Sequence, residues 1–248
     1  LERHKNIKNY ISAKFKLINN QNRNSLALVN KHDKNIMSKI NRKIKYKSKI
    51  IKVNTKIEKK YLDKFKNKNF LSRSNIENLS FVIKFCEIFK VKKYNLVKTV
   101  NNFKGLEYRQ QIIYKDKEIM VINDSKSTSY SSSIELLSKP NHIYWLVGGV
   151  PKKDDKFRLS NNFYKNINAY IFGKNKKKFL FDLKDKIKLK EFSNLEKALK
   201  RLLKDIKIDS SQKKIILFSP AAASFDKFKN FEDRGQYFNK LIRKYINA

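Results

Sequence analysis

The stretch SPAAASFDKFKNFEDRG (Ser219–Gly235) lies between a short apolar run, KKIILF (Lys213–Phe218), and a segment with apolar residues at helical spacing. The run predicts a buried strand, and the spacing of Phe238, Leu241 and Ile242 predicts a helix. Small side chains between a strand and a helix let a ligand approach the backbone, which is typical of the binding edge of an α/β sheet. A tight connection without a ligand fits the same pattern, so this stretch alone predicts the fold and leaves the function open.

The composition is that of a globular protein, with 248 residues of which 40% are hydrophobic and 12% aromatic. That length holds one large domain or two ordinary ones. The formal net charge of +37 is the unusual value. Because the lysines are spread over nearly every segment, we interpret the charge as compositional drift and expect no specific nucleic-acid partner. A basic nucleic-acid-binding module is the alternative from a different functional class.

The single cysteine, Cys86, excludes an internal disulfide and suits a reducing compartment. No run reaches the roughly 18 apolar residues of a membrane span, and the start of the chain lacks the pattern of a signal peptide. We therefore expect a cytoplasmic protein that does not insert into membranes.

Before residue 105 the sequence predicts mainly helices. The elements expected there are an amphipathic helix in residues 1–20, a strand at Leu26–Asn30, one or two strands in residues 39–53, and helices at 72–91 and 94–103. Ser74 or Asn75 is expected to cap the helix at 72–91. The buried stripe expected on that helix is Ile76, Leu79, Ile83, Cys86 and Phe89. Gly105 is expected to end the last helix, and we place a domain boundary there.

After residue 105 strands and helices alternate. The expected elements are a hairpin in residues 109–123, a helix near 128–137, strands at 142–150 and 167–174, helices near 175–183 and 193–205, and the final strand and helix. Strands that alternate with helices, with glycines or small residues at the strand exits, predict a doubly wound parallel sheet over residues 105–248.

Two motifs resemble one known family. The stretch at Ser219–Gly235 closely resembles SPACASFDQFKNFEERG, a signature of the UDP-N-acetylmuramoyl-L-alanine:D-glutamate ligases (MurD) of the Mur ligase family. VINDSKSTS (Val121–Ser129) resembles INDSKATN of the same family, and the order and separation of the two blocks also fit. The resemblance implies an α/β chain with a Rossmann-like C-terminal ligase domain, residues 105–248, after a partial central ATPase domain, residues 1–104.

The implied activity is ATP-dependent amide formation in peptidoglycan precursor synthesis. ATP phosphorylates the carboxylate of UDP-N-acetylmuramoyl-L-alanine, and the amine of D-glutamate then attacks the acyl phosphate. Such chemistry needs cations around the migrating phosphoryl group and a fixed second substrate. The resemblance further implies Mg²⁺ beside ATP, and a monomer when full length. Another Mur ligase or a folylpolyglutamate synthase shares this architecture, but the motif at Ser219–Gly235 argues against both.

The resemblance assigns roles to residues 109–128. Lys126 would supply positive charge near the phosphate or D-glutamate, Asp124 a hydrogen bond near the nucleotide, and Thr128 a hydroxyl to a D-glutamate carboxylate. GLEYRQQ keeps Arg109, where the family contacts nucleotide phosphates. Read without the resemblance, Asp124 is an ordinary helix cap and Arg109 opens an exposed strand without a function.

The resemblance also implies the remaining D-glutamate contacts. GGVPKK (Gly148–Lys153) matches the family's GG-x-x-K, which makes Lys152 the expected partner of D-glutamate and its neighbour Lys153 the rival. Ser224 and the backbone amide of Phe231 are expected to hold the other D-glutamate carboxylate.

The N-terminal part carries shorter matches. LERH (Leu1–His4) and NYISAK (Asn9–Lys14) match family segments, and Lys14 falls on a catalytic lysine that the family carries as a carbamate near a second magnesium. Without the motif, Lys14 is an ordinary surface lysine. Asn75 and Asn78 match asparagines near the nucleotide base. The sequence has no GxxxxGK(S/T) phosphate loop, so we expect a part of the enzyme that is inactive by itself.

Overall fold

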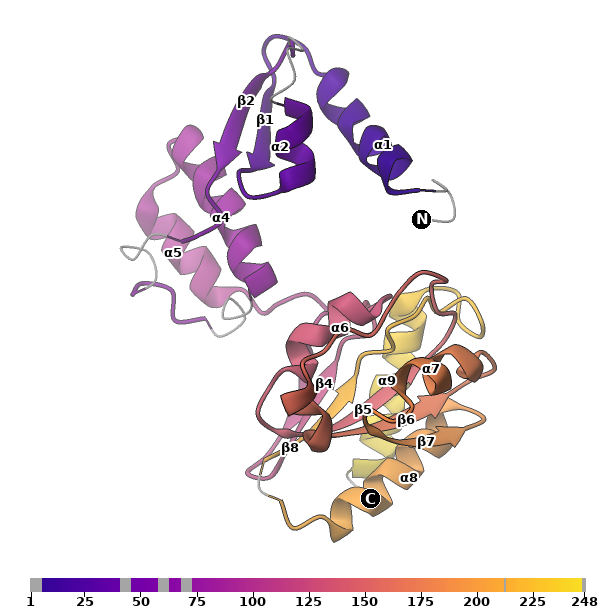
Figure 1. Ribbon diagram of the computed structural model, residues 1–248. Coiled ribbons are helices and arrows are strands. Elements are labelled where there is room, and N and C mark those ends of the chain that lie inside the picture. The colour runs from indigo at the N-terminus through magenta and orange to yellow at the C-terminus, as the bar shows by residue number, and fades with distance from the viewer. Residues whose placement is uncertain (1–5, 41–45, 58–62, 68–72, 212, 247–248) are drawn as a thin grey trace. The chain divides into compact units, whose positions relative to one another are not determined.

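The computed structural model describes residues 6–40, 46–57, 63–67, 73–211 and 213–246 (Figure 1). The LERH motif at residues 1–4 therefore lies outside the described residues. The chain divides into two compact units, Leu1–Lys104 and Gly105–Ala248. In the described ranges, no helix combines the length and the apolar character needed to cross a membrane.

The N-terminal unit combines a small parallel sheet with helices. Its described elements are α1 (Ile7–Asn19), β1 (Leu26–Asn30), α2 (Lys34–Ile40), β2 (Lys49–Val53), α4 (Arg73–Ile88) and α5 (Lys93–Asn102). Strands β1 and β2 pair in parallel, with Leu28 beside Ile51. Helices α4 and α5 share a core of Leu79, Ile83, Leu96 and Val100.

Several details of this unit differ from the sequence predictions. Residues 39 and 40 end helix α2 rather than starting a strand, because the carboxylate of Asp33 accepts the amides of Asn35 and Ile36 and so caps a helix there. Ser74 and Asn75 lie inside α4, which begins at Arg73, and therefore do not cap it.

Two further predictions at helix ends are wrong. Phe89 does not belong to the buried stripe of α4, because it lies beyond the end of the helix and is 58% exposed. Gly105 has a left-handed backbone, φ +83°, but α5 already ends at Asn102, where the amide of Phe103 bonds the carbonyl of Val100.

The C-terminal unit is built on one six-stranded sheet. Its elements are β3 (Gln111–Lys115), β4 (Ile119–Asn123), α6 (Tyr130–Leu137), β5 (His142–Gly148), the 3₁₀ helix η3 (Asn161–Asn166), β6 (Ile167–Phe172), α7 (Lys176–Leu183), β7 (Lys188–Phe192), α8 (Leu195–Ile208), β8 (Lys214–Phe218) and α9 (Phe231–Ile246). The strand order is β3-β4-β8-β5-β6-β7, and only β3 runs antiparallel to its neighbour. The predicted doubly wound sheet is confirmed. Strand β7 and helix η3 were not predicted.

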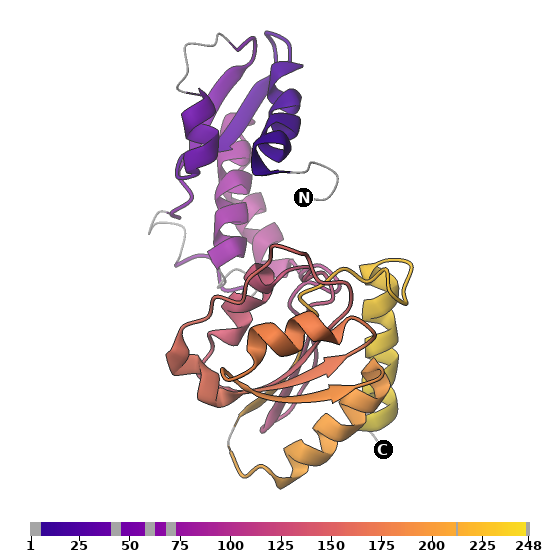
Figure 2. The same ribbon diagram turned by 45° about the vertical axis from the view of Figure 1, so that its right-hand side comes forward.

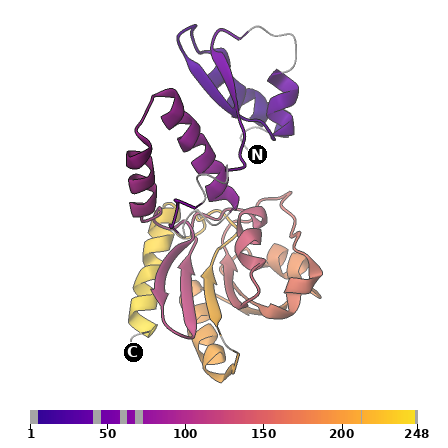
Figure 3. The ribbon, with the colours of Figure 1, turned by 90° about the vertical axis from the view of Figure 1, so that its left-hand side faces the viewer.

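Helices cover both faces of this sheet (Figures 1 and 2). One apolar core joins α6 and α7 to the face that carries Trp145, and the other joins α8 and α9 to the face that carries Phe218. Helix α9 lies along the part of the sheet that contains β4 (Figure 3). With both faces covered, the ends of the strands are the places where a small ligand can reach the sheet.

The core of this unit makes a direct prediction about stability. Leu202 of α8 is fully buried, whereas Ile208 at the end of the same helix is 84% exposed. We expect Leu202→Ala to lower the free energy of unfolding by about 2–5 kcal/mol, because it leaves a cavity, and Ile208→Ala to change it by less than about 0.5 kcal/mol.

Urea titrations followed by fluorescence test this prediction. The only tryptophan of the chain, Trp145, is buried in this unit and reports on its unfolding. Equal losses in the two variants would contradict the assigned packing of α8.

Candidate functional site

The candidate site lies where three neighbouring parallel strands end. We name its parts the β4 loop (residues 124–129), the β5 loop (residues 149–160) and the β8 loop (residues 219–230). Because β8 pairs with both β4 and β5, the three loops leave the same edge of the sheet side by side. The β5 and β8 loops are also bonded to each other, since Val150 and Ala223 exchange backbone hydrogen bonds of 2.9 and 3.0 Å.

The β4 loop is joined to the start of α9. The hydroxyl of Ser125 donates to the carbonyl of Phe231 at 2.8 Å, and the side-chain amide of Asn123, the last residue of β4, donates to the carbonyl of Gly235 at 2.9 Å. The ammonium of Lys126 lies 3.8 Å from the centre of the Phe231 ring, a cation–π contact. Two predicted site residues, Lys126 and Phe231, therefore meet, and the start of a helix adds amides that favour an anion.

Asp124 is held by donors on both of its oxygens. The hydroxyl of Ser219 donates to Oδ2 at 2.8 Å, and the amide of Gln110 donates to Oδ1 at 3.2 Å. A chain of buried hydroxyls continues from Ser219 to Ser133 at 2.7 Å and from Ser133 to Ser127 at 2.8 Å. This network fixes the carboxylate at the junction of the β4 and β8 loops.

Burial controls the charge of this carboxylate. Asp124 is only 6% exposed, and this loss of hydration raises its pKa to about 6, although the hydrogen bonds from Ser219 and Gln110 and the charge of Arg109 act in the opposite direction. The group therefore changes charge close to neutral pH.

The other predicted residues of this unit differ in exposure. Ser224 is 4% exposed, and within the described part of the chain no group bonds its hydroxyl. Thr128 is partly exposed, while Arg109, Lys152 and Lys153 are exposed. A hydroxyl without a protein partner can donate a hydrogen bond to an acidic group of a ligand, and exposed cationic side chains can pair with such a group.

Sequence reasoning missed the most buried charge of the site. Arg234 is 1% exposed and donates to the carbonyls of Ser125 and Ala222 at 2.7 and 3.0 Å. The spacing in the sequence indicates this burial, because Arg234 precedes the buried residues Phe238 and Leu241 by four and seven positions and so shares their helix face.

The predicted residues of the N-terminal unit are not gathered in this way. Lys14 is exposed on α1, with its ammonium 5.6 Å from the centre of the Tyr10 ring. Asn75 and Asn78 both lie on α4, the former partly buried and the latter exposed. Among the described residues, no three His, Cys, Asp or Glu side chains gather as metal ligands.

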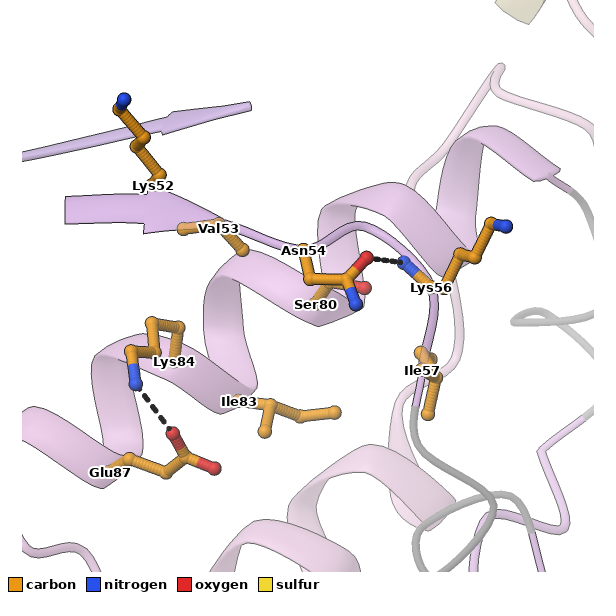
Figure 4. A pocket seen from close by; sticks show the side chains of 9 residues that line it. All are labelled: Lys52, Val53, Asn54, Lys56, Ile57, Ser80, Ile83, Lys84 and Glu87. Carbon is orange, nitrogen blue, oxygen red and sulfur yellow. Dashed lines mark hydrogen bonds and ion pairs between the residues drawn. The ribbon is translucent and has the colours of Figure 1, made fainter. Parts of the chain in front are cut away.

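This unit also contains a pocket of about 180 Å³ between the end of β2 and α4 (Figure 4). Lys84 points towards Glu87 in an ion pair of 3.1 Å, and Asn54 accepts the backbone amide of Lys56. None of the residues predicted from the motifs lines this pocket.

Comparison with known proteins identifies the family. No protein-family model matches the chain. The UDP-N-acetylmuramoylalanine--D-glutamate ligase of Rickettsia felis is 33% identical over 179 residues, which cover 72% of this chain and 40% of that protein. The ligase of the same name from Wolbachia sp. subsp. Brugia malayi is 34% identical over 69% of this chain and 34% of its own length. The chain belongs to the Mur ligase family.

A third Mur ligase relative covers almost the whole chain. The UDP-N-acetylmuramoylalanine--D-glutamate ligase of Rickettsia bellii is 29% identical over 97% of this chain and 58% of its own length. The chain thus spans between 34% and 58% of the length of these three relatives. The family resemblance predicted from the two motifs is confirmed.

Solved Mur ligase structures share the fold. The MurF ligase of Thermotoga maritima, in complex with ADP, matches 97% of this chain with a TM-score of 0.63 and 14% identity, over 59% of its own length. A murein peptide ligase from Psychrobacter arcticus matches 96% of this chain with a TM-score of 0.56 and 8% identity, over 54% of its own length. At these identities the likeness shows the fold alone.

The pKa of Asp124 makes stability depend on pH. Asp124 binds its proton more tightly in the folded state than in the unfolded state, where the pKa of an aspartate is 3.8. Protonation of Asp124 therefore stabilises the folded state fully below about pH 4, and this stabilisation is lost as the pH rises through about 6. A shift of about two units corresponds to about 3 kcal/mol. The unsubstituted chain loses this stabilisation between pH 4 and 7, whereas Asp124→Asn has no carboxyl group to ionise. We therefore expect the difference in unfolding free energy, Asp124→Asn minus the unsubstituted chain, to rise by up to about 3 kcal/mol over this range.

Urea titrations at both pH values, followed by Trp145 fluorescence, measure the difference. Asp154→Asn, which changes an exposed carboxylate in the β5 loop, is the control and should leave the pH dependence unchanged. A constant difference between Asp124→Asn and the unsubstituted chain would show that burial does not perturb this carboxyl group.

Proposed function

We propose that this chain forms the D-glutamate-binding part of an ATP-dependent Mur ligase. In the proposed reaction, ATP phosphorylates UDP-N-acetylmuramoyl-L-alanine, and D-glutamate attacks the acyl phosphate and expels phosphate. The observation that carries the proposal is the convergence of both family motifs on one edge of the sheet, where Lys126 contacts Phe231. The identity to D-glutamate ligases of Rickettsia and Wolbachia supports the choice of amino acid.

The two acidic groups of D-glutamate find complementary partners at this edge. We assign one carboxylate to Lys152 and Thr128, and the other to Ser224 and the backbone amide of Phe231. The Val150–Ala223 bridge favours this assignment, because it bonds the loop that carries Lys152 to the loop that carries Ser224. Holding both carboxylates directs the amine towards the acyl phosphate, which lowers the entropic part of the barrier.

The remaining charges suit the nucleotide and the phosphoryl group. Lys126 would stabilise negative charge that develops on the phosphoryl oxygens, and Arg109 and Asp124 would contact ATP. Asn75 and Asn78 are assigned to the nucleotide base. Magnesium would neutralise phosphate charge when bound, with Lys14, as a carbamate, assigned to help hold it. We infer a cytoplasmic activity, because ATP and these precursors are intracellular compounds. We also infer that the full-length protein acts as a monomer.

The D-glutamate assignment is tested in a chimaera in which this chain replaces the matching part of the Rickettsia bellii ligase. We expect Lys152→Ala and Ser224→Ala each to raise KM for D-glutamate about 10- to 100-fold, because each removes a hydrogen bond to a charged group worth about 1.5–3 kcal/mol. KM for ATP should change little.

Lys153→Ala is the matched control, since it removes the neighbouring exposed lysine. Equal effects of the two lysine substitutions would reject the assignment of Lys152. Equal use of L- and D-glutamate by the chimaera would reject the pocket as a whole.

Lys14 can be tested in the same chimaera. If it acts as a carbamate, Lys14→Ala should abolish activity, and short carboxylic acids should restore part of it by supplying the missing anion. Lys16→Ala, which changes another exposed lysine of α1, is the control. Full activity of Lys14→Ala would make Lys14 an ordinary surface lysine.

A further inference from the structure

The guanidinium of Arg234 bridges two of the three site loops. Its Nη2 donates to the carbonyl of Ser125 in the β4 loop at 2.7 Å and to the carbonyl of Ala222 in the β8 loop at 3.0 Å. Its Nε donates to the hydroxyl of Ser125 at 3.1 Å. One planar group thereby sets the separation of two backbone segments that follow β4 and β8, strands that lie far apart in the sequence.

The third loop lies against the same group. A Cβ atom added at Gly149 would lie 3.1 Å from Nη1 of Arg234 and 2.5 Å from the carbonyl oxygen of Ala223. Gly149 also has φ +130°, which side chains disfavour. Only glycine therefore lets the β5 loop approach the guanidinium this closely.

The charge of Arg234 is balanced by nearby carboxylates. Burial lowers the pKa of Arg234 to about 10, and the charges of Asp226 and Asp124 act against this loss. Asp226, in the β8 loop, is also close to the exit of β6, because a Cβ at Gly173 would lie 3.2 Å from its Oδ2. Among the residues that the structure describes, the buried Nη1 finds no hydrogen-bond partner, so part of the cost of burying this cation is not recovered in hydrogen bonds there.

The contacts of Arg234 fall next to the residues assigned to the substrate. Ser125 precedes Lys126, Ala222 lies two residues before Ser224, and Gly149 lies three residues before Lys152. The hydroxyl of Ser125, which accepts from Arg234, in turn donates to the carbonyl of Phe231. A shift of the guanidinium would therefore move all three loops and the start of α9.

We propose that Arg234 is a positioning residue, which fixes the spacing of the β4, β5 and β8 loops and so preorganises the site for a dicarboxylic amino acid. The role in substrate binding rests on the proposed function. Lysine cannot reproduce this set of contacts, because Nη2 of Arg234 bonds both carbonyls while a second nitrogen, Nε, bonds the hydroxyl, and an ammonium offers only one nitrogen.

The experiment compares Arg234→Lys, Ser125→Ala and the control Arg243→Lys in the full chain. Arg243 lies on the same helix and is exposed. Amide hydrogen exchange reads the loops directly, because the amides of Lys126, Val150 and Ala223 donate to the carbonyls of Tyr108, Ala223 and Val150. D-Glutamate affinity is measured by calorimetric titration.

We expect Arg234→Lys to speed exchange of these three amides at least 10-fold while amides in the centre of β5 stay protected, and to weaken D-glutamate binding about 10- to 100-fold. Ser125→Ala should show the same pattern with smaller changes, and Arg243→Lys should show none. In Arg234→Ala, millimolar guanidinium should restore part of the affinity and equal ammonium should not, which distinguishes positioning from general stability.

The outcomes separate the two proposals. Unchanged exchange of the three loop amides in Arg234→Lys would overturn the positioning role. If Arg234→Lys does not fold, the exchange rates of the same three amides are measured in Ser125→Ala instead. Unchanged exchange in that variant would also reject the positioning role of Arg234. If the unsubstituted chain binds no D-glutamate, the proposed function fails, and the exchange rates still decide whether Arg234 fixes the loops.

Discussion

The position of β8 between β4 and β5 is the constraint on which the site depends. The chain returns from the far edge of the sheet to insert its last strand there, so that three parallel strands end side by side. Neighbouring strands lie about 4.8 Å apart, and the three exits therefore span about 10 Å, a width that suits a small amino acid. Both family motifs owe their proximity to this single topological step, since the first follows β4 and the second follows β8.

The same step places polar groups in an otherwise apolar interior. Asp124, Ser219 and Arg234 are each at most 6% exposed, and burial shifts the pKa of both charged groups towards their neutral forms. Such groups are costly to bury unless they are bonded, which explains why Asp124 receives two donors and Arg234 contacts two carbonyls. The two apolar cores, one on each face of the sheet, offset this cost. The free-energy cost of burying these polar groups is confined to one edge of the sheet, where their hydrogen bonds fix the geometry of the candidate site.

Periodicity and motif spacing predicted much of this architecture. The amphipathic helix α8 has a strong pattern because it buries one continuous apolar face, and β5 and β8 are continuous apolar runs because both faces of the sheet are covered. Helix α2 was missed because its start depends on the single cap at Asp33, and β7 because only Leu189 and Phe192 of its five residues face the interior in part. The motif residues were found through the resemblance, whereas the burial of Arg234 depends on long-range contacts that no local pattern contains.

Arg234 also shows how side-chain chemistry, rather than charge, decides residue choice in this chain. Lysine suits a position where a cation must reach a ligand from a flexible stem, which is the role we propose for Lys126 and the exposed Lys152. Between the β4 and β8 loops the need is different, because the carbonyl and hydroxyl of Ser125 and the carbonyl of Ala222 must be held at fixed distances by one group with donors on two nitrogens. A planar fork with donors in fixed directions meets that need and an ammonium does not. In a chain dominated by lysine, the arginine at this position is therefore explained by geometry and not by net charge.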